Sequence, residues 1–384
     1  MTAGHLINDI LGPPGAWRFV RAVVLIFAIS AVFRMIPVPR RRIGYGHRQP
    51  QPRAVIPAIA TALALLVAGA GIYGLTRYRG PDQVTGVTTG HAPASALAKP
   101  ASAGATAMTY PYTPRVGVFE PSATASYKLV DEFMKSTRIR PGFVLYYSGW
   151  NDPFQLRFAA WAHAAGAVPF AQLEPEGVHL REIAAGRYDG YLRSFASAVR
   201  DYGHQVVLGF APEMNGNWYG WGAGHTKPSV WIAAWRHVVD VFRAIGASTV
   251  TWLWTVNSIN AARAPLRQWW PGARYVSWIG IDGYYYRPTD TFGSVFGSTI
   301  REVRMFTAAP IMISETGAAP STHEAAQINA LFNGVRAHHL RGAVWFDMAQ
   351  HDGPYHLDWR LEDSPAGLAA FRHAVRADLN SGHY

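Results

Sequence analysis

Eight short apolar runs alternate with segments of helical periodicity from Arg115 onward, and this alternation constrains the fold more than any other feature. Repeated strand–helix units build a parallel sheet that is covered on both faces, so its strands are apolar throughout. The predicted strands span residues 115–119, 143–148, 168–173, 205–210, 250–255, 275–281, 310–314 and 343–346. Eight such units within residues 113–384 fit a (β/α)8 TIM barrel, which typically takes ~250 residues. A doubly wound sheet is the alternative, but no glycine-rich phosphate loop follows the first strand.

Four segments between these runs have the spacing of amphipathic helices. The third begins with a predicted capping box at Ser321-Thr322-His323-Glu324, and the last places Pro365 at its first helical position. The predicted helices cover residues 188–203, 231–242, 321–335 and 365–379.

The chain is basic, but its charge is unevenly distributed. The formal net charge is +11, and residues 1–112 carry 11 Lys/Arg against two Asp. The remaining residues carry 24 Lys/Arg and 22 Asp/Glu, which is close to neutral. A nucleic-acid-binding function therefore has little support. Because the sequence has no cysteine, disulfides, thiolate metal sites and cysteine nucleophiles are excluded.

An uncharged apolar run at residues 54–75 predicts a transmembrane helix, since 22 residues at ~1.5 Å each cross a bilayer core of about 30 Å. Arginines concentrate before this run, so residues 1–53 are expected to be a basic cytoplasmic segment and the later chain to be extracytoplasmic. Residues 76–112 are rich in Ala, Ser, Thr and Pro and predict a flexible linker. The barrel domain would then occupy residues 113–384.

Two alternatives apply to this N-terminal part. Ala68-Gly69-Ala70 has the form of a signal-peptidase site, so a cleaved signal peptide is an alternative to a retained anchor. Residues 22–33 form a second, shorter apolar stretch that either lies in the interface or spans the membrane. With a retained anchor, the predicted location of the protein is the cell membrane, and the later domain is outside whether or not residues 22–33 span the bilayer.

Two glutamates follow apolar strands at corresponding places. Glu213 comes after the predicted strand 205–210, and Glu315 comes after the predicted strand 310–314. The C-terminal strand ends of a TIM barrel carry its chemistry, so both side chains are expected at one mouth. Paired carboxylates there suit glycosidic cleavage by an acid and a nucleophile, which predicts a separation of about 5–5.5 Å for a retaining enzyme. The structural alternative is that each glutamate caps a helix or pairs with an arginine.

The residues around these glutamates resemble glycoside hydrolase family 26. The segment PEMNGNWYGWG is similar to its acid/base motif and ISETG to its nucleophile motif. The resemblance implies a (β/α)8 fold, retention of configuration and endo-attack on β-linked polysaccharides. It makes Glu213 the acid/base and Glu315 the nucleophile. It further implies that Tyr284 orients the nucleophile and that Trp218 lines the sugar-binding cleft.

One position departs from the family pattern. Family mannanases usually have histidine directly before the acid/base, where this chain has Pro212. That histidine helps to hold the catalytic network and the sugar, so Pro212 separates this chain from the family mannanases at the position that bears on the substrate. The resemblance implies a β-1,4-linked polysaccharide, with β-mannan ahead of mixed-linkage β-1,3-1,4-glucan. A non-hydrolysing carbohydrate-binding barrel is the alternative from another functional class, and only Pro212 favours it.

Other polar and aromatic residues near strand ends are candidates for binding the sugar. Flat indole faces stack on pyranose rings, although core packing explains each tryptophan equally well. The candidates are Trp150, Trp254, Trp345, Trp359, Asn257 and Glu174. Histidine pairs lack metal-ligand spacing, so neither a metal nor another cofactor is predicted. No GxSxG motif is present, which excludes the serine-hydrolase elbow.

Overall fold

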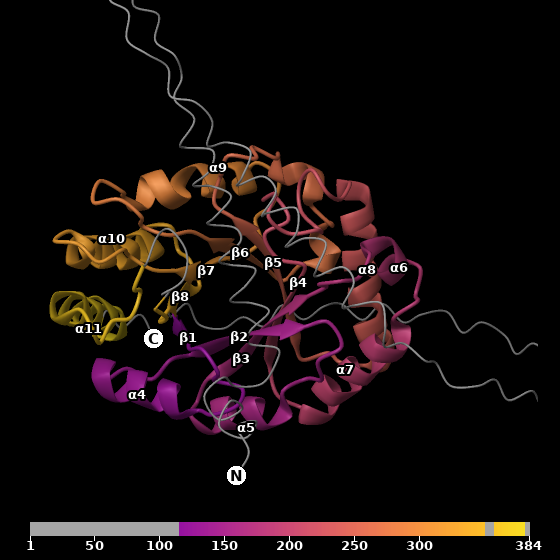
Figure 1. Ribbon diagram of the computed structural model, residues 1–384, viewed down its shortest axis with the longest axis horizontal. Helices are drawn as coiled ribbons and strands as arrows, with labels where there is room; N and C mark the ends of the chain where they lie inside the picture. Colours follow the sequence, from indigo (N-terminus) through magenta and orange to yellow (C-terminus); the bar gives the residue numbers. More distant parts are fainter. Residues whose placement is uncertain (1–114, 350–356, 381–384) are drawn as a thin grey trace, which may run out of the picture. The chain divides into compact units, whose positions relative to one another are not determined.

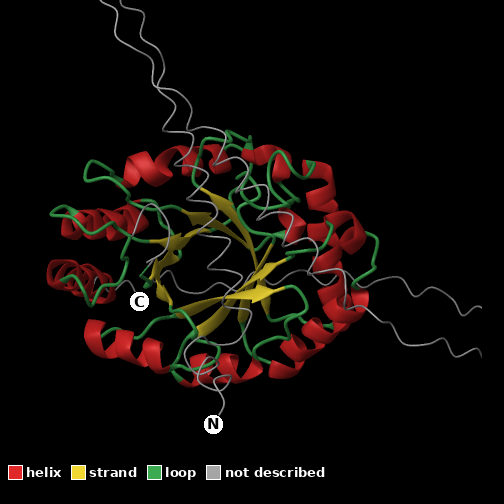
Figure 2. Cartoon of the chain, viewed as in Figure 1, coloured by secondary structure: helices red, strands yellow, loops and turns green. Residues whose placement is uncertain are grey.

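The computed structural model describes residues 115–349 and 357–380. Within them, eight parallel strands close into a barrel in sequence order, with β8 beside β1. Figures 1 and 2 show the strands as a central ring with the helices around it. The strands are β1 (Arg115–Phe119), β2 (Phe143–Gly149), β3 (Val168–Glu174), β4 (Val206–Phe210), β5 (Val250–Asn257), β6 (Trp278–Asp282), β7 (Ile311–Thr316) and β8 (Gly342–Phe346).

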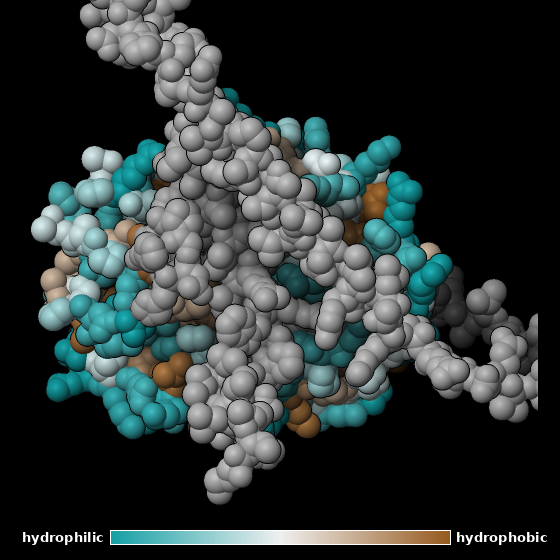
Figure 3. All heavy atoms as spheres, viewed as in Figure 1, coloured by the Kyte–Doolittle hydropathy of each residue, from teal (hydrophilic) through white to brown (hydrophobic). Residues whose placement is uncertain are grey.

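Helices cover the outside of this ring, and in Figure 3 the visible outer rim is mostly hydrophilic. They bury the apolar stripe that their sequence periodicity indicates. The α-helices are α4 (Lys128–Thr137), α5 (Leu156–Ala164), α6 (Leu180–Ala184), α7 (Asp189–Tyr202), α8 (Pro228–Ile245), α9 (Ser298–Arg304), α10 (Glu324–Ala337) and α11 (Pro365–Asn380). Short 3-10 or π turns are η1 (Leu266–Trp269), η2 (Ala273–Tyr275) and η3 (Gly293–Gly297).

The predicted (β/α)8 barrel is confirmed, with small differences at the strand ends. The sixth strand begins at Trp278 rather than at Tyr275, because residues 273–275 form the turn η2. The seventh extends to Thr316, so Glu315 lies within β7 rather than after it. Each strand of a barrel is hydrogen-bonded to a neighbour on both sides, so the pairing can continue beyond the last apolar residue of the strand.

Alternate strand residues divide the core in two, because successive side chains point to opposite faces of a strand. One cluster fills the barrel interior and includes Phe143, Leu145 and Phe170. A larger cluster lies between the strands and the helices. Gly209 belongs to the interior, where a Cβ atom would approach Gln172 Oε1 to 1.9 Å. Gln172 instead donates to Thr255 Oγ1 at 2.8 Å, so the interior polar layer depends on that glycine.

Two helix starts test the capping predictions. Pro365 is the first residue of α11, as predicted, and the Ser364 hydroxyl accepts the Gly367 N–H at 3.1 Å. The predicted capping box at Ser321–Glu324 is wrong, because α10 begins at Glu324 and has no side-chain cap. Glu324 instead turns inward and accepts a hydrogen bond from the Ser364 hydroxyl at 2.5 Å. This contact joins the starts of α10 and α11.

The predicted cytoplasmic segment, transmembrane helix and linker fall in residues 1–112, outside the described residues. Among the residues that the structure describes, no helix combines the length and the apolar character needed to cross a bilayer. The membrane anchor therefore stays a prediction from the sequence.

Candidate active site

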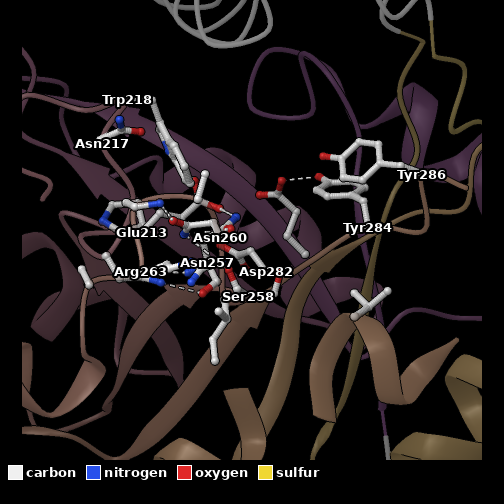
Figure 4. A pocket seen from close by; sticks show the side chains of 18 of the residues that line it. Glu213, Asn217, Trp218, Asn257, Ser258, Asn260, Arg263, Asp282, Tyr284 and Tyr286 are labelled. Carbon is white, nitrogen blue, oxygen red and sulfur yellow. Dashed lines mark hydrogen bonds between the residues drawn. The ribbon is translucent and has the colours of Figure 1, made fainter. Parts of the chain in front are cut away.

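A cleft of about 1150 Å³ opens at the mouth of the barrel where the C-terminal strand ends meet. Both Glu213 and Glu315 line it, together with Tyr284, Trp218 and Asn257. Figure 4 shows Glu213, Trp218 and Asn257 on one side of the cleft and Tyr284 on the other. The strand spacing that predicted a shared mouth for the two glutamates is therefore confirmed.

Glu213 lies three residues after β4, in the loop that leads to α8. Its side chain accepts two hydrogen bonds, from Trp218 Nε1 to Oε2 at 2.8 Å and from Asn257 Nδ2 to Oε1 at 2.6 Å. Its backbone has a φ of +53°, which is unusual for a residue other than glycine. The carboxyl group is thus fixed by donors from two separate parts of the barrel mouth.

Glu315 lies on β7 and accepts hydrogen bonds from two tyrosine hydroxyls. Tyr284 donates to Oε1 and Tyr147 donates to Oε2. The Tyr284 contact agrees with the orienting role that the sequence implied. Tyr147, on β2, was not predicted, because the run FVLYYS contains two adjacent tyrosines and does not itself show which one faces inward.

The two catalytic candidates affect one another's protonation. Burial raises the pKa of Glu213, while the hydrogen bonds from Asn257 and Trp218 lower it. Burial, followed by the charge of Glu213, raises the pKa of Glu315 to about 7, against the hydrogen bonds from Tyr147 and Tyr284. Because repulsion between carboxylates is mutual, the pair keeps one proton up to about pH 7.

Asn257 is itself held in place at the end of β5. Its backbone N–H donates to Asn215 Oδ1 at 2.9 Å, and Asn215 Nδ2 donates back to the Asn257 carbonyl at 2.8 Å. Asn215 lies two residues after Glu213 and is buried. This reciprocal pair joins the Glu213 loop to β5, so the expected cleft position of Asn257 is confirmed in geometry.

Four predicted sugar-binding residues lie elsewhere. Trp254 and Trp345 are 0% and 1% exposed, and both indoles pack on the helix side of the barrel wall. Trp150 and Glu174 are also buried, and neither lines the cleft. Stacking of these three tryptophans on a sugar is therefore wrong, as is direct sugar contact by Glu174. The three indoles pack in the core, which was the alternative interpretation for each of them.

Two further aromatic residues line the cleft, the candidate Trp359 and Tyr286, which was not predicted. Trp359 follows β8 and packs against Tyr284 with ring centroids 4.8 Å apart. Tyr286 is 45% exposed and packs against Trp359 at 5.8 Å. The segment GIDGYYY contains Tyr284 and Tyr286 at alternate positions, which is the signal that both face the same side.

The sequence matches known proteins over its central part. Residues 184–333 match the model of glycosyl hydrolase family 26. Endoglucanase H of Acetivibrio thermocellus is 31% identical over 248 residues, which cover 60% of this chain and 27% of the endoglucanase. Mannan endo-1,4-beta-mannosidase A and B of Caldalkalibacillus mannanilyticus is 30% identical over 92 residues, or 22% of this chain and 17% of that protein. The chain thus spans only part of the length of either relative.

A solved endo-beta-1,4-mannanase of Cellulomonas fimi resembles the barrel in structure. The TM-score is 0.52 at 15% identity, and the match covers 68% of this chain and 70% of the mannanase. At that identity the likeness concerns the fold. The matched family segment includes both Glu213 and Glu315, so the family match and the cleft concern the same residues.

Proposed function

We propose that this barrel, whose residues 184–333 match the model of glycosyl hydrolase family 26, is a member of that family and a retaining endo-β-glycanase. The observation that carries the proposal is the pair of buried carboxyl groups that line one cleft at the barrel mouth. Each group has its own hydrogen-bond donors, and the pair shares a proton near neutral pH. That state, with one carboxylate and one carboxylic acid, is what glycosidic cleavage by double displacement requires.

In the first step, a Glu315 oxygen attacks the anomeric carbon while Glu213 transfers its proton to the departing glycosidic oxygen. The new bond is a glycosyl ester to Glu315, and the bond to the leaving sugar breaks. The hydroxyl groups of Tyr147 and Tyr284 hold the Glu315 carboxylate during the attack. The donors on Glu213 hold the acid beside the leaving group.

In the second step, Glu213 acts as a base. It takes a proton from water, the water oxygen attacks the anomeric carbon, and Glu315 leaves as a carboxylate. Two inversions at the same carbon restore the β-configuration. Glu213 ends with its proton and Glu315 with its charge, which returns the pair to its starting state.

The names of two relatives support the proposed substrate class. The sequence favours β-mannan, and the relative named a mannan endo-1,4-beta-mannosidase supports that choice. The relative named an endoglucanase, with the longer match, supports a β-glucan as the second candidate. Both are β-linked polysaccharides, so the proposed chemistry is the same for either.

The test is a product screen of the full chain on β-mannan, mixed-linkage β-glucan, xylan and cellulose. Short oligosaccharides released from one or more of these, without a preference for chain ends, are the expected result. Glu315→Gln serves as the matched control, because it keeps the size of the nucleophile and removes its charge. If the wild type binds a polysaccharide but releases no product, the hydrolase proposal is wrong and the non-hydrolysing carbohydrate-binding barrel takes its place.

A further inference from the structure

The backbone beside Glu213 adopts a strained conformation. Ala211 has a φ of +46° and Glu213 a φ of +53°, so two left-handed residues flank Pro212. Residues other than glycine rarely take this conformation, and a residue before proline prefers an extended backbone. Such strain persists only where the surroundings hold it, and it concentrates at functional sites.

Two buried tryptophans hold this segment from the side away from the sugar. Trp221 Nε1 donates to the Pro212 carbonyl at 2.7 Å, and Trp231 Nε1 donates to the Ala211 carbonyl at 3.2 Å. Trp221 is 4% exposed and stacks on Tyr219 with centroids 4.2 Å apart and an interplanar angle of 11°. Trp231 belongs to α8 and is fully buried. Neither indole lines the cleft.

Neighbouring strands hold the same segment through its amide groups. The Ala211 N–H donates to the Leu173 carbonyl of β3 at 2.9 Å, and the Glu213 N–H donates to the Thr255 carbonyl of β5 at 3.0 Å. The Glu213 carbonyl accepts the Gly216 N–H at 2.9 Å. The direction in which Glu213 enters the cleft is thus set by backbone contacts, before Trp218 and Asn257 contact its carboxyl group.

Resting on the proposed function, we propose that Trp221 is a positioning residue for the acid/base. Its indole N–H fixes the Pro212 carbonyl and thereby the left-handed backbone that directs Glu213 at the leaving oxygen. The Pro212 carbonyl belongs to the peptide bond that joins Pro212 to Glu213. Losing its partner therefore rotates the backbone of Glu213 itself. Trp231 supports the preceding peptide in the same way.

The readout that separates positioning from general stability is the leaving group. A poor leaving group needs the proton of Glu213, whereas dinitrophenolate departs without one. Trp221→Phe keeps an aromatic ring beside Tyr219 and removes the N–H donor together with the rest of the indole's five-membered ring. We expect it to lower kcat/KM, which reports the first step, at least tenfold more on the polysaccharide than on a 2,4-dinitrophenyl β-glycoside of the matching disaccharide.

Trp235→Phe is the matched control. Trp235 is a buried indole of the same helix as Trp231, and it donates to the Tyr275 carbonyl at 3.1 Å, away from the Glu213 loop. It should lower both rates by the same small factor. A double-mutant cycle of Trp221→Phe and Glu213→Gln separates a positioning effect on Glu213 from a general loss of folded protein. In the Glu213→Gln background, Trp221→Phe should cause no further loss on polysaccharide.

The outcomes distinguish this inference from the proposed function. Equal losses on both substrates in Trp221→Phe, or a full additional loss in the Glu213→Gln background, would overturn the positioning role and leave the hydrolase intact. A wild type that cleaves neither substrate would overturn the proposed function, and the inference with it.

Discussion

At the scale of single residues, the account assigns different roles to two glutamates. Glu315→Ala removes the nucleophile and should abolish turnover of every substrate. Glu213→Ala should lose most activity on polysaccharide but retain much of the first-step rate on an activated aryl glycoside. Azide added to Glu213→Ala should restore turnover and give a β-glycosyl azide, because azide needs no general base. The products are identified by NMR spectroscopy.

Glu132→Ala serves as a control for these variants, because Glu132 is an exposed residue of α4. Its activity should equal that of the wild type. If Glu213→Ala hydrolyses polysaccharide at the wild-type rate, another group supplies the proton and the acid/base assignment is wrong.

The shared proton gives a second prediction about residues. Burial and the charge of Glu213 raise the pKa of Glu315 to about 7, and burial raises the pKa of Glu213, so the kcat on polysaccharide should fall as rising pH removes the proton that the pair shares. In Glu315→Gln the repelling charge is gone, so the pKa of Glu213 should lie below its wild-type value. A titration of 13C-labelled glutamate carboxyl groups by NMR measures this pKa. An unchanged pKa in the variant would contradict electrostatic coupling between the two groups.

The residues that the sequence did not place share a physical cause. Successive side chains of a barrel strand point alternately to the barrel interior and to the helices. In a run that is apolar throughout, the sequence does not show which positions face the interior. Tyr146 and Tyr147 are adjacent, yet only Tyr147 reaches the cleft. Asn257 and Trp254 are three positions apart on β5 and therefore point to opposite faces. The glutamates were visible because a carboxylate beside an apolar strand stands out.

At the scale of elements, α11 closes the helical layer beside α4 and α10. Phe371 is 0% exposed and meets the rings of Phe133, Phe332 and Trp345 edge-on. Phe371→Ala should therefore lower the free energy of unfolding by about 3–5 kcal/mol, the usual cost of this truncation in a core. Denaturant unfolding of the full chain, followed by tryptophan fluorescence, measures the change.

His373 provides the comparison on the same helix, because it is exposed. His373→Ala should change the free energy of unfolding by less than about 0.5 kcal/mol. A similar small change for Phe371→Ala would mean that α11 does not contribute to the stability of the barrel.

The eight strands and the helices α7, α8, α10 and α11 were predictable from the sequence, since each buries a regular apolar pattern, whereas α4, α5, α6 and α9 were not predicted. Sequence periodicity does not show which hydrogen bonds end a strand or helix. For this reason the predicted start of the sixth strand and the predicted capping box of α10 were wrong. At Glu324 a contact with Ser364, 40 positions later, replaces the local cap. Such tertiary contacts depend on how α10 and α11 pack together, which local sequence does not encode.

At the scale of the whole molecule, the predicted anchor at residues 54–75 stays a proposal. If it holds, the barrel is outside the cell and protease added to intact cells should release it. The released fragment should begin within residues 76–112, which N-terminal sequencing would establish. A barrel that resists protease until the membrane is opened would reverse the proposed orientation, and a barrel already free in the medium would favour a cleaved signal peptide.

The central claim is that this barrel hydrolyses a β-glycan by double displacement through Glu315 and Glu213. The most direct measurement is 1H NMR spectroscopy of the anomeric protons during the first minutes of hydrolysis of the polysaccharide that the screen identifies. The account predicts that the β-anomer of the new reducing end forms first and that the α-anomer follows only by mutarotation. The α-anomer as the first product would mean a single displacement by water, which contradicts the assignment of Glu315 as the nucleophile.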